Sequence, residues 1–225
     1  MFVGAIALPL LVLALCTPPS HPIIAEVFYD AVGDDTGHEF VELFNPSAVP
    51  FALAGARLEA GDGAGAGRWT LRWTGAPEDT IAAGGRFLGG GGLVAPAPDA
   101  VVQLDLQNGP DAVRLVWPDG AAEVVGYGAH TLAEYFCGAP AADVPSGQSL
   151  GRVPDDSDLG SNAQDFRAAT PSPAAANLPG RDAALIAGAL ALAPEQPAPG
   201  ATATLAGALR NLGAELIAER EVEVL

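Results

Sequence analysis

Four aspartates lie between residues 155 and 165, a stretch that also contains Gly, Ser and Asn. Calcium gathers several oxygen ligands over a tight turn, so this stretch is a candidate calcium site. Its ligands would be Asp155, Asp156, Asp158 and Asp165. The spacing differs from that of an EF-hand loop, because no Glu occupies the last ligand position. The alternative, which the irregular spacing favours, is that these side chains form Asx-turns and cap loop backbone.

A second group of polar residues lies between residues 34 and 42. A metal site or an acid–base pair would have to combine His38 with Glu39 or Glu42. These two glutamates have opposite parity on a strand, so we expect them to point to opposite faces of the sheet. Residues 34–37, Asp-Asp-Thr-Gly, are predicted to form a turn before that strand.

Other patterns associated with catalysis are missing from the sequence. The three histidines are far apart and none belongs to an HExxH pattern, and no serine stands in a Gly-x-Ser-x-Gly elbow. The glycine-rich stretches 61–67 and 89–92 lack the Lys-Ser/Thr ending of a phosphate-binding loop and are predicted to be flexible loops. We therefore expect no enzymatic activity and no cofactor in this chain, with calcium the one ion that its residues suggest.

The charge balance excludes two classes of partner. The chain has 10 basic and 27 acidic residues, a formal net charge of −17, and its basic residues are all arginines spread singly along the sequence. Nucleic acids and anionic membrane surfaces are bound by clustered cations. We expect a protein or cell-surface partner, no nucleic acid, and contact with a membrane only through an N-terminal anchor.

Residues 1–21 are predicted to be an export signal followed by a tether. The apolar run 2–15 is shorter than the roughly 20 residues that a membrane-spanning helix needs. Leu13, Ala14, Leu15 and Cys16 are similar to a lipobox, in which the cysteine becomes lipidated, although the residue before the cysteine is normally small. The alternatives are lipidation of Cys16 and ordinary cleavage nearby. In either case Cys137 is left as the remaining cysteine, and we expect it to be a buried thiol.

From residue 23 onward the apolar positions recur with a period of two, in short runs separated by turn residues. This pattern predicts an all-β sandwich or barrel. Alternation is clear at residues 69–73, where Trp69, Leu71 and Trp73 fall on one face, and at residues 102–106, where Gln103 and Asp105 separate the apolar residues. Together with Trp117, these tryptophans are expected to fill the core. If they were exposed instead, they would be able to stack on sugar rings.

Residues 22–177 resemble a bacterial lamin-tail domain. The resemblance rests on IIAEVFYDAVGDDTGHEFVELFNPSAVPFALAG (23–55), GGRFL (84–88), VQLDLQNGPDAVRLVWPDGAAEVVGYG (102–128) and SGQSLGRVPDDSDLGSNAQDFRAATPSPAAAN (146–177). It implies an immunoglobulin-like β-sandwich that serves as an interaction module in exported bacterial proteins, often beside hydrolase or nuclease modules. Residues 60–67 and 129–145 depart from the family pattern and are expected to be long surface loops.

After a linker at residues 178–182, residues 183–225 resemble the start of a cell-adhesion-related, CARDB-type immunoglobulin-like repeat. The resemblance rests on AALI (183–186), LALAP (190–194), PGATATL (199–205) and RNLG (210–213). It implies an incomplete second β-sandwich and therefore a fragment of a longer polypeptide. An alanine-rich helix over residues 183–193 is the alternative.

These observations predict a non-catalytic module for interaction or adhesion that is exported or held at the cell surface. One alternative is the targeting and docking arm of a larger extracellular hydrolase or nuclease whose catalytic domain lies beyond residue 225. A second alternative is a carbohydrate-binding module that uses exposed aromatic residues.

Overall fold

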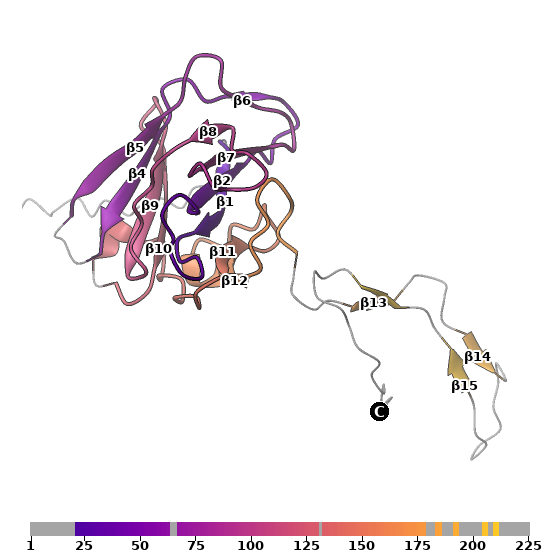
Figure 1. Cartoon of the computed structure of the whole chain (residues 1–225). Coiled ribbons are helices and arrows are strands. Elements are labelled where there is room, and N and C mark those ends of the chain that lie inside the picture. Colours follow the sequence, from indigo (N-terminus) through magenta and orange to yellow (C-terminus); the bar gives the residue numbers. More distant parts are fainter. Residues whose placement is uncertain are drawn as a thin grey trace, which may run out of the picture.

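The computed structural model describes residues 21–63, 67–130 and 132–178, together with the backbone of four short strands between residues 183 and 211 (Figure 1). Residues 21–178 form two facing β-sheets, so the all-β fold expected from the alternating pattern is confirmed. The apolar run 2–15, Cys16 and the tether lie outside the described residues. Within the described part of the chain, no helix is long and apolar enough to cross a membrane.

The larger sheet has six strands in the order β12-β11-β1-β2-β7-β8. Its neighbours are antiparallel except for the last pair, β7 and β8, which are parallel. The strands are β1 (Ile23–Phe28), β2 (Phe40–Phe44), β7 (Arg86–Gly90), β8 (Ala100–Val101), β11 (Ser149–Arg152) and β12 (Phe166–Ala169).

The smaller sheet has four antiparallel strands in the order β10-β9-β4-β5. They are β4 (Arg57–Asp62), β5 (Trp69–Thr74), β9 (Asp111–Val116) and β10 (Ala122–Tyr127). A short pair, β3 (Phe51–Ala52) and β6 (Thr80–Ile81), and two single-turn helices, η1 (Ala133–Tyr135) and α1 (Asn162–Asp165), complete the sandwich.

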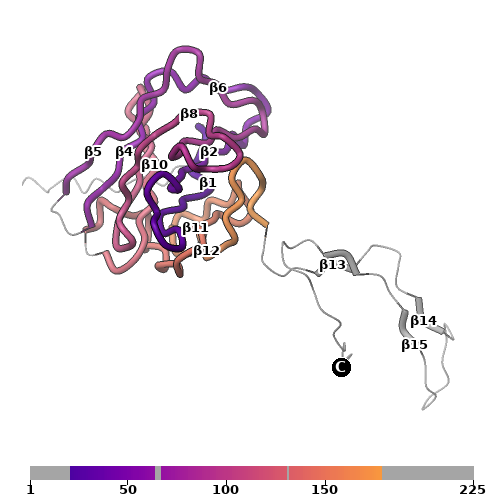
Figure 2. Tube along the Cα trace, in the orientation of Figure 1, coloured from indigo at the N-terminus to yellow at the C-terminus, as the bar shows by residue number. Residues whose placement is uncertain are grey.

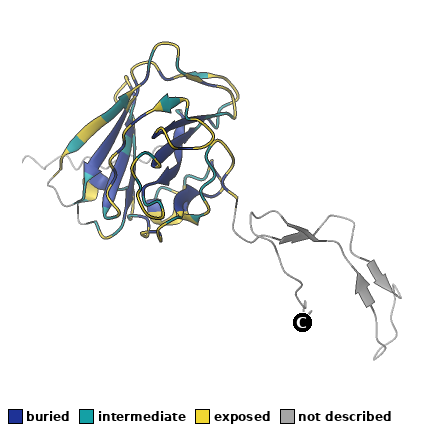
Figure 3. Ribbon diagram, in the orientation of Figure 1, coloured by how far each residue is buried: buried dark blue, intermediate teal, exposed yellow. Residues whose placement is uncertain are grey.

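The core lies between the two sheets and is filled by alternate residues of the strands. Leu43, Leu115 and Leu150 are at most 3% exposed and belong to one apolar cluster. In Figure 3, strands such as β1 and β2 are accordingly buried, whereas β5 is exposed along much of its length. This is the alternating arrangement of a sandwich, in which each strand directs every second side chain inward.

The segment after β8 closes the sandwich on the side of β5. Val102, Leu104 and Leu106 enter the same core, and Gln103 and Asp105 are exposed. The expected alternation at residues 102–106 is therefore confirmed. However, only Ala100–Val101 pairs as a strand, and it pairs with β7 alone.

The expectation that Trp69, Leu71 and Trp73 share one face is wrong. A β-bulge at Arg72 shifts the register, because Leu58 opposes Trp73 while the next residue of β4, Glu59, opposes Leu71. Such a bulge inserts one extra residue and reverses the alternation beyond it. Trp73 therefore packs against the core, whereas Leu71 is 54% exposed.

The stretches expected to be surface loops or flexible glycine runs are partly built into the sandwich. Tyr135, in η1, is fully buried, and its hydroxyl accepts the N–H of Arg68 at 2.9 Å. Gly89 and Gly90 end strand β7, and Gly61 lies in β4. A Cβ on Gly90 would lie 2.9 Å from the Cβ of Phe40, so this glycine is required for close packing of neighbouring strands.

The segment 170–178 after β12, which we call the strap, lies beside β1 although the two are far apart in the sequence (Figure 2). It covers the outer face of the larger sheet, where Glu26 and Glu42 are cross-strand partners with no exposed surface. Backbone N–H groups of Ser172 and Ala174 donate to these two carboxylates. The strap therefore extends the folded unit beyond its last strand.

Four short strands follow the strap. β13 (Ala183–Leu185) pairs with β16 (Leu209–Asn211), and β14 (Ala191–Ala193) pairs with β15 (Thr204–Ala206). The alternative of a continuous helix over residues 183–193 is therefore wrong, because backbone pairing with distant strands outweighs the local helix propensity of alanine. The proposed CARDB-type repeat stays a prediction.

Candidate functional site

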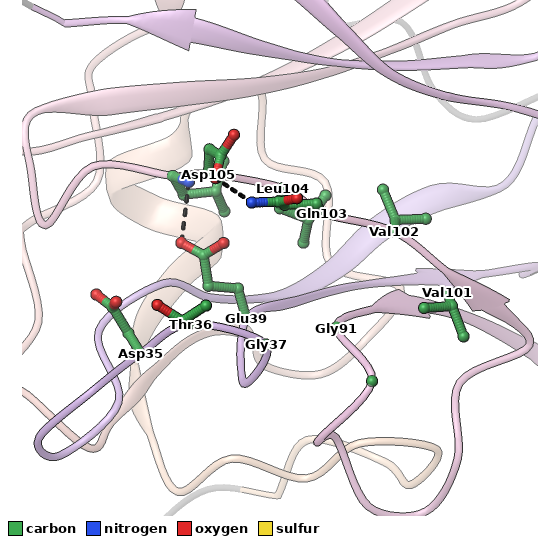
Figure 4. Close-up of a pocket in the computed structure, with 12 residues that line it drawn as sticks. Asp35, Thr36, Gly37, Glu39, Gly91, Val101, Val102, Gln103, Leu104 and Asp105 are labelled. Carbon is green, nitrogen blue, oxygen red and sulfur yellow. Dashed lines mark hydrogen bonds between the residues drawn. The ribbon is translucent and has the colours of Figure 1, made fainter.

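A hollow of about 510 Å³ opens beside β8, the free edge of the larger sheet (Figure 4). Three segments line it: residues 35–37 with Glu39, the glycine pair Gly91 and Gly92, and residues 101–106, and the first lies more than fifty residues before the other two. In Figure 4, the side chain of Glu39, the residue before β2, extends toward the chain at Asp105.

The predicted turn before β2 forms the floor of the hollow. The Thr36 N–H donates to the Asp34 side chain at 3.0 Å, and Gly37 adopts a φ of 82°, which glycine tolerates well. The N–H of Gly91 then donates to the Glu39 carbonyl at 2.9 Å. A Cβ on Gly91 would lie 2.3 Å from the carbonyl oxygen of Gly37, so this close approach of the two segments requires a glycine.

The hollow is acidic. Asp35, Glu39 and Asp105 line it, and its lining contains no Arg, Lys or His. Asp105 also accepts from Arg72 of the smaller sheet, with an Nη1–Oδ2 distance of 2.9 Å. The hollow therefore contains more negative than positive charge, and it lies where the edges of the two sheets meet.

Glu39 is the most buried of the three carboxylates, with 9% of its surface exposed. Burial raises its pKa to about 7, and the backbone N–H of Leu106, which donates to Oε1 at 2.9 Å, offsets part of this effect. Glu42 reaches the opposite side of the sheet and accepts from the strap, so the prediction that the two glutamates point to opposite faces is confirmed.

The chemistry available in the hollow is electrostatic. Its lining contains no Ser, Cys, Tyr or His, and its one hydroxyl belongs to the exposed Thr36 in the turn. The carboxylates are spread along the walls, and no group of three or more His, Cys, Asp or Glu residues that could hold a metal ion occurs among the described residues. The arrangement is suited to an extended organic cation more than to a metal or a covalent reaction.

The four aspartates of the predicted calcium site are placed differently from one another. Asp155 is buried, pairs with Arg86 and accepts the N–H of Asn177 at 2.9 Å. Asp165 is also buried and accepts the N–H of Leu159 at 2.7 Å. These contacts occupy the two carboxylates with partners from the protein itself.

The other two aspartates lie nearer the surface. Asp158 accepts the N–H of Gly160 at 3.2 Å, the geometry of an Asx-turn, and Asp156 is exposed. The capping role offered as the alternative is thus present in the structure, while calcium binding stays a prediction.

Two buried polar clusters stabilise the sandwich, and sequence reasoning missed most of their members. In the first, Arg86 contacts both Asp155 and Glu42, with its Nε 3.0 Å from Glu42 Oε1. Burial raises the pKa of Glu26 and raises that of Glu42 to about 7. The sequence signal that could have predicted this cluster is a single glutamate inside each of two largely apolar strands, Glu26 in IIAEVF and Glu42 in FVELF.

In the second cluster, Arg152 joins the sheets at the edge opposite the hollow. Its guanidinium contacts Glu123 of β10, donates to the Ile24 carbonyl at 2.9 Å and lies 4.5 Å from the ring centre of Phe166. Burial raises the pKa of Glu123 to about 7, although the nearby charge of Arg152 acts in the other direction. Both clusters join separate segments of the sandwich through buried ion pairs.

The tryptophans do not form an exposed stacking platform. Trp117 lies in the core with 4% exposure, and Trp73 packs 5.2 Å from Phe87. Trp69 is half-buried on the outer face of the smaller sheet, where Arg114 covers its ring at 4.2 Å. The expectation of core filling is confirmed for Trp117 and Trp73, and Trp69 differs because the bulge turns it outward.

Cys137 is not the thiol that we expected, because it is disulfide-bonded. Disulfide pairing depends on which cysteines come together in space, and sequence spacing does not determine this. Cys16, the other cysteine of the chain and the predicted lipidation site, lies outside the described residues.

Comparisons with protein-family models, curated proteins and solved structures give no match to this chain. The lamin-tail and CARDB resemblances therefore stay predictions.

Proposed function

We propose that residues 22–177 form a non-catalytic interaction module of immunoglobulin-like, lamin-tail type. The observation that carries the proposal is the acidic hollow beside an open sheet edge, which offers charge and backbone hydrogen bonds, and whose lining contains no Ser, Cys, Tyr or His. Binding at such an edge needs no bond rearrangement, and the residues elsewhere that have raised pKa values are engaged in structural contacts.

The test is an activity survey of the purified chain on nucleic acids, phosphoesters and glycans, combined with affinity capture of cell-surface proteins. We expect no turnover above that of a heat-denatured sample, and saturable binding to a protein. Turnover that co-purifies with the folded chain would contradict the proposal. Saturable binding to a polysaccharide, accompanied by quenching of tryptophan fluorescence, would favour the carbohydrate-binding alternative.

We further propose that the chain is exported. The apolar run 2–15 supports this, and so does the disulfide of Cys137, because disulfides persist mainly in oxidising compartments. Lipidation of Cys16 would require its sulfur to be free of a disulfide. Cell fractionation of the wild type and Cys16→Ser tests the anchor, and recovery of both proteins in the cytosol would contradict export.

A further inference from the structure

The free edge of β8 has backbone groups directed away from the sheet. Strand β8 pairs in parallel with β7, and the N–H of Val102 donates to the Gly90 carbonyl at 2.8 Å. Because alternate residues of a strand direct their backbone groups to opposite sides, those of Val101 and Gln103 point outward. No strand of the described chain pairs with this side of β8.

The residues that continue from this edge are anchored in the core. Val102, Leu104 and Leu106 are at most 6% exposed and anchor the segment between the two sheets, whereas the side chain of Val101 is 75% exposed. An edge fixed in this way is ordered before binding, which reduces the entropy lost when a second strand adds to it.

The hollow lies directly below this edge, and the two share residues 101–106. Of its three carboxylates, Asp35 and Glu39 precede β2 and Asp105 follows β8, and no Arg, Lys or His is among its lining residues. A long side chain that ends in a guanidinium or ammonium group would reach these carboxylates from a strand paired with the edge.

From this juxtaposition we propose that the β8 edge binds an extended, basic segment of a partner protein. The partner adds a strand along Val101 and Gln103 and inserts an Arg or Lys side chain into the hollow beside Glu39, Asp35 and Asp105. This inference rests on the proposed function as an interaction module and names the class of its partner. The net charge of −17 would steer a basic segment toward the chain.

The same charges argue against a second copy of this chain as the occupant. Edge-to-edge pairing of two copies would bring two acidic hollows together, and each copy has a net charge of −17. Like charges placed opposite each other across an interface oppose association.

The test uses the full 225-residue chain and a library of nine-residue peptides with one fixed central Arg and random flanking residues. The best binder is resynthesised in two altered forms. One has citrulline, the neutral analogue of arginine, in place of the Arg, and the other has N-methyl groups on alternate backbone nitrogens. We expect each altered peptide to bind at least about tenfold more weakly by calorimetry, since one removes the charge and the other removes the backbone donors.

The protein variants are Glu39→Gln, Val101→Pro and a control, Asp156→Asn. Val101→Pro removes an outward N–H at an exposed position where an edge strand tolerates proline. Asp156→Asn removes an exposed carboxylate beyond β11, on the far side of the same sheet. We expect about tenfold weaker binding of the Arg peptide by the first two variants and unchanged binding by the control. The circular dichroism spectra of all three should match that of the wild type.

Three results would overturn the inference: no binder in the library, equal binding of the Arg and citrulline peptides, or equal weakening by Asp156→Asn and Glu39→Gln. None of these results would contradict the proposed function. That proposal is contradicted by a different result, turnover in the activity survey.

Discussion

Replacing Glu39 by Gln is expected to stabilise the protein while weakening its binding of basic peptides. Burial raises the pKa of Glu39 from 4.5 to about 7 in the folded chain. The folded state therefore binds this proton more tightly than the unfolded state, and stability falls as the pH rises from 4.5 through 7. Each tenfold difference in proton affinity corresponds to about 1.4 kcal/mol. Ionisation of Glu39 therefore lowers the free energy of unfolding by about 3 kcal/mol above pH 7.

A glutamine side chain stays neutral, and its carbonyl oxygen is able to accept the N–H of Leu106 as Glu39 does. We therefore expect Glu39→Gln to raise the free energy of unfolding by about 2 to 3 kcal/mol near pH 8 and to change it little near pH 4. Like charges on Asp35 and Asp105 act in the same direction as burial.

Urea unfolding at both pH values, followed by tryptophan fluorescence, measures this difference. Asp156→Asn, which removes an exposed carboxylate, is the matched control and should shift stability equally at the two pH values. If Glu39→Gln is less stable than the wild type at the higher pH, the carboxylate stabilises the fold and the reasoning from its burial is wrong.

Three further changes test the structural contacts. Arg152→Met leaves Glu123 and Asp165 without their buried cation, so urea unfolding should show a loss of about 3 to 5 kcal/mol in the free energy of unfolding. Adding Glu123→Gln should restore part of this loss, and a loss below about 1 kcal/mol for Arg152→Met would contradict a structural role. The side-chain amide of Asn162 accepts the N–H groups of Gly126 and Cys137 and donates to the Val124 carbonyl. In thermal unfolding, Asn162→Ala should therefore lower the free energy of unfolding by about 2 to 4 kcal/mol. An unchanged melting temperature would mean that water replaces these hydrogen bonds. For the acidic segment, we expect millimolar calcium to raise the melting temperature no more than matched ionic strength does; a calcium-specific rise that Asp158→Asn abolishes would establish a metal site.

The alternating sequence predicted the sandwich and much of its core, because burial on one face of a strand leaves a period of two. The inward positions of Val102, Leu104 and Leu106 are examples. The face of Trp69 was not predictable from its own strand. It depends on the bulge at Arg72, which exists only in the pairing with β4.

The candidate site was predicted only in part. The turn at residues 34–37 and the opposite orientations of Glu39 and Glu42 follow from local rules. The hollow itself joins the segment before β2 to two segments more than fifty residues later in the chain, so no spacing in the sequence predicts it. The buried charges of Glu26 and Glu42 are likewise tolerated only because Arg86 and the strap reach them from elsewhere in the chain.

The strap determines how a pulling force would enter the sandwich. The chain leaves the folded unit just after Asn177, whose side-chain amide donates to the Ala25 carbonyl at 3.0 Å and whose N–H donates to Asp155. Tension transmitted from later parts of the polypeptide would therefore load the bonds between the strap and β1 before it reaches the strand ladders. If the chain is tethered at its N-terminal end, before β1, that force would cross the molecule through β1 and the strap, which lie side by side. The hollow at the β8 edge of the same sheet would then bear none of this force.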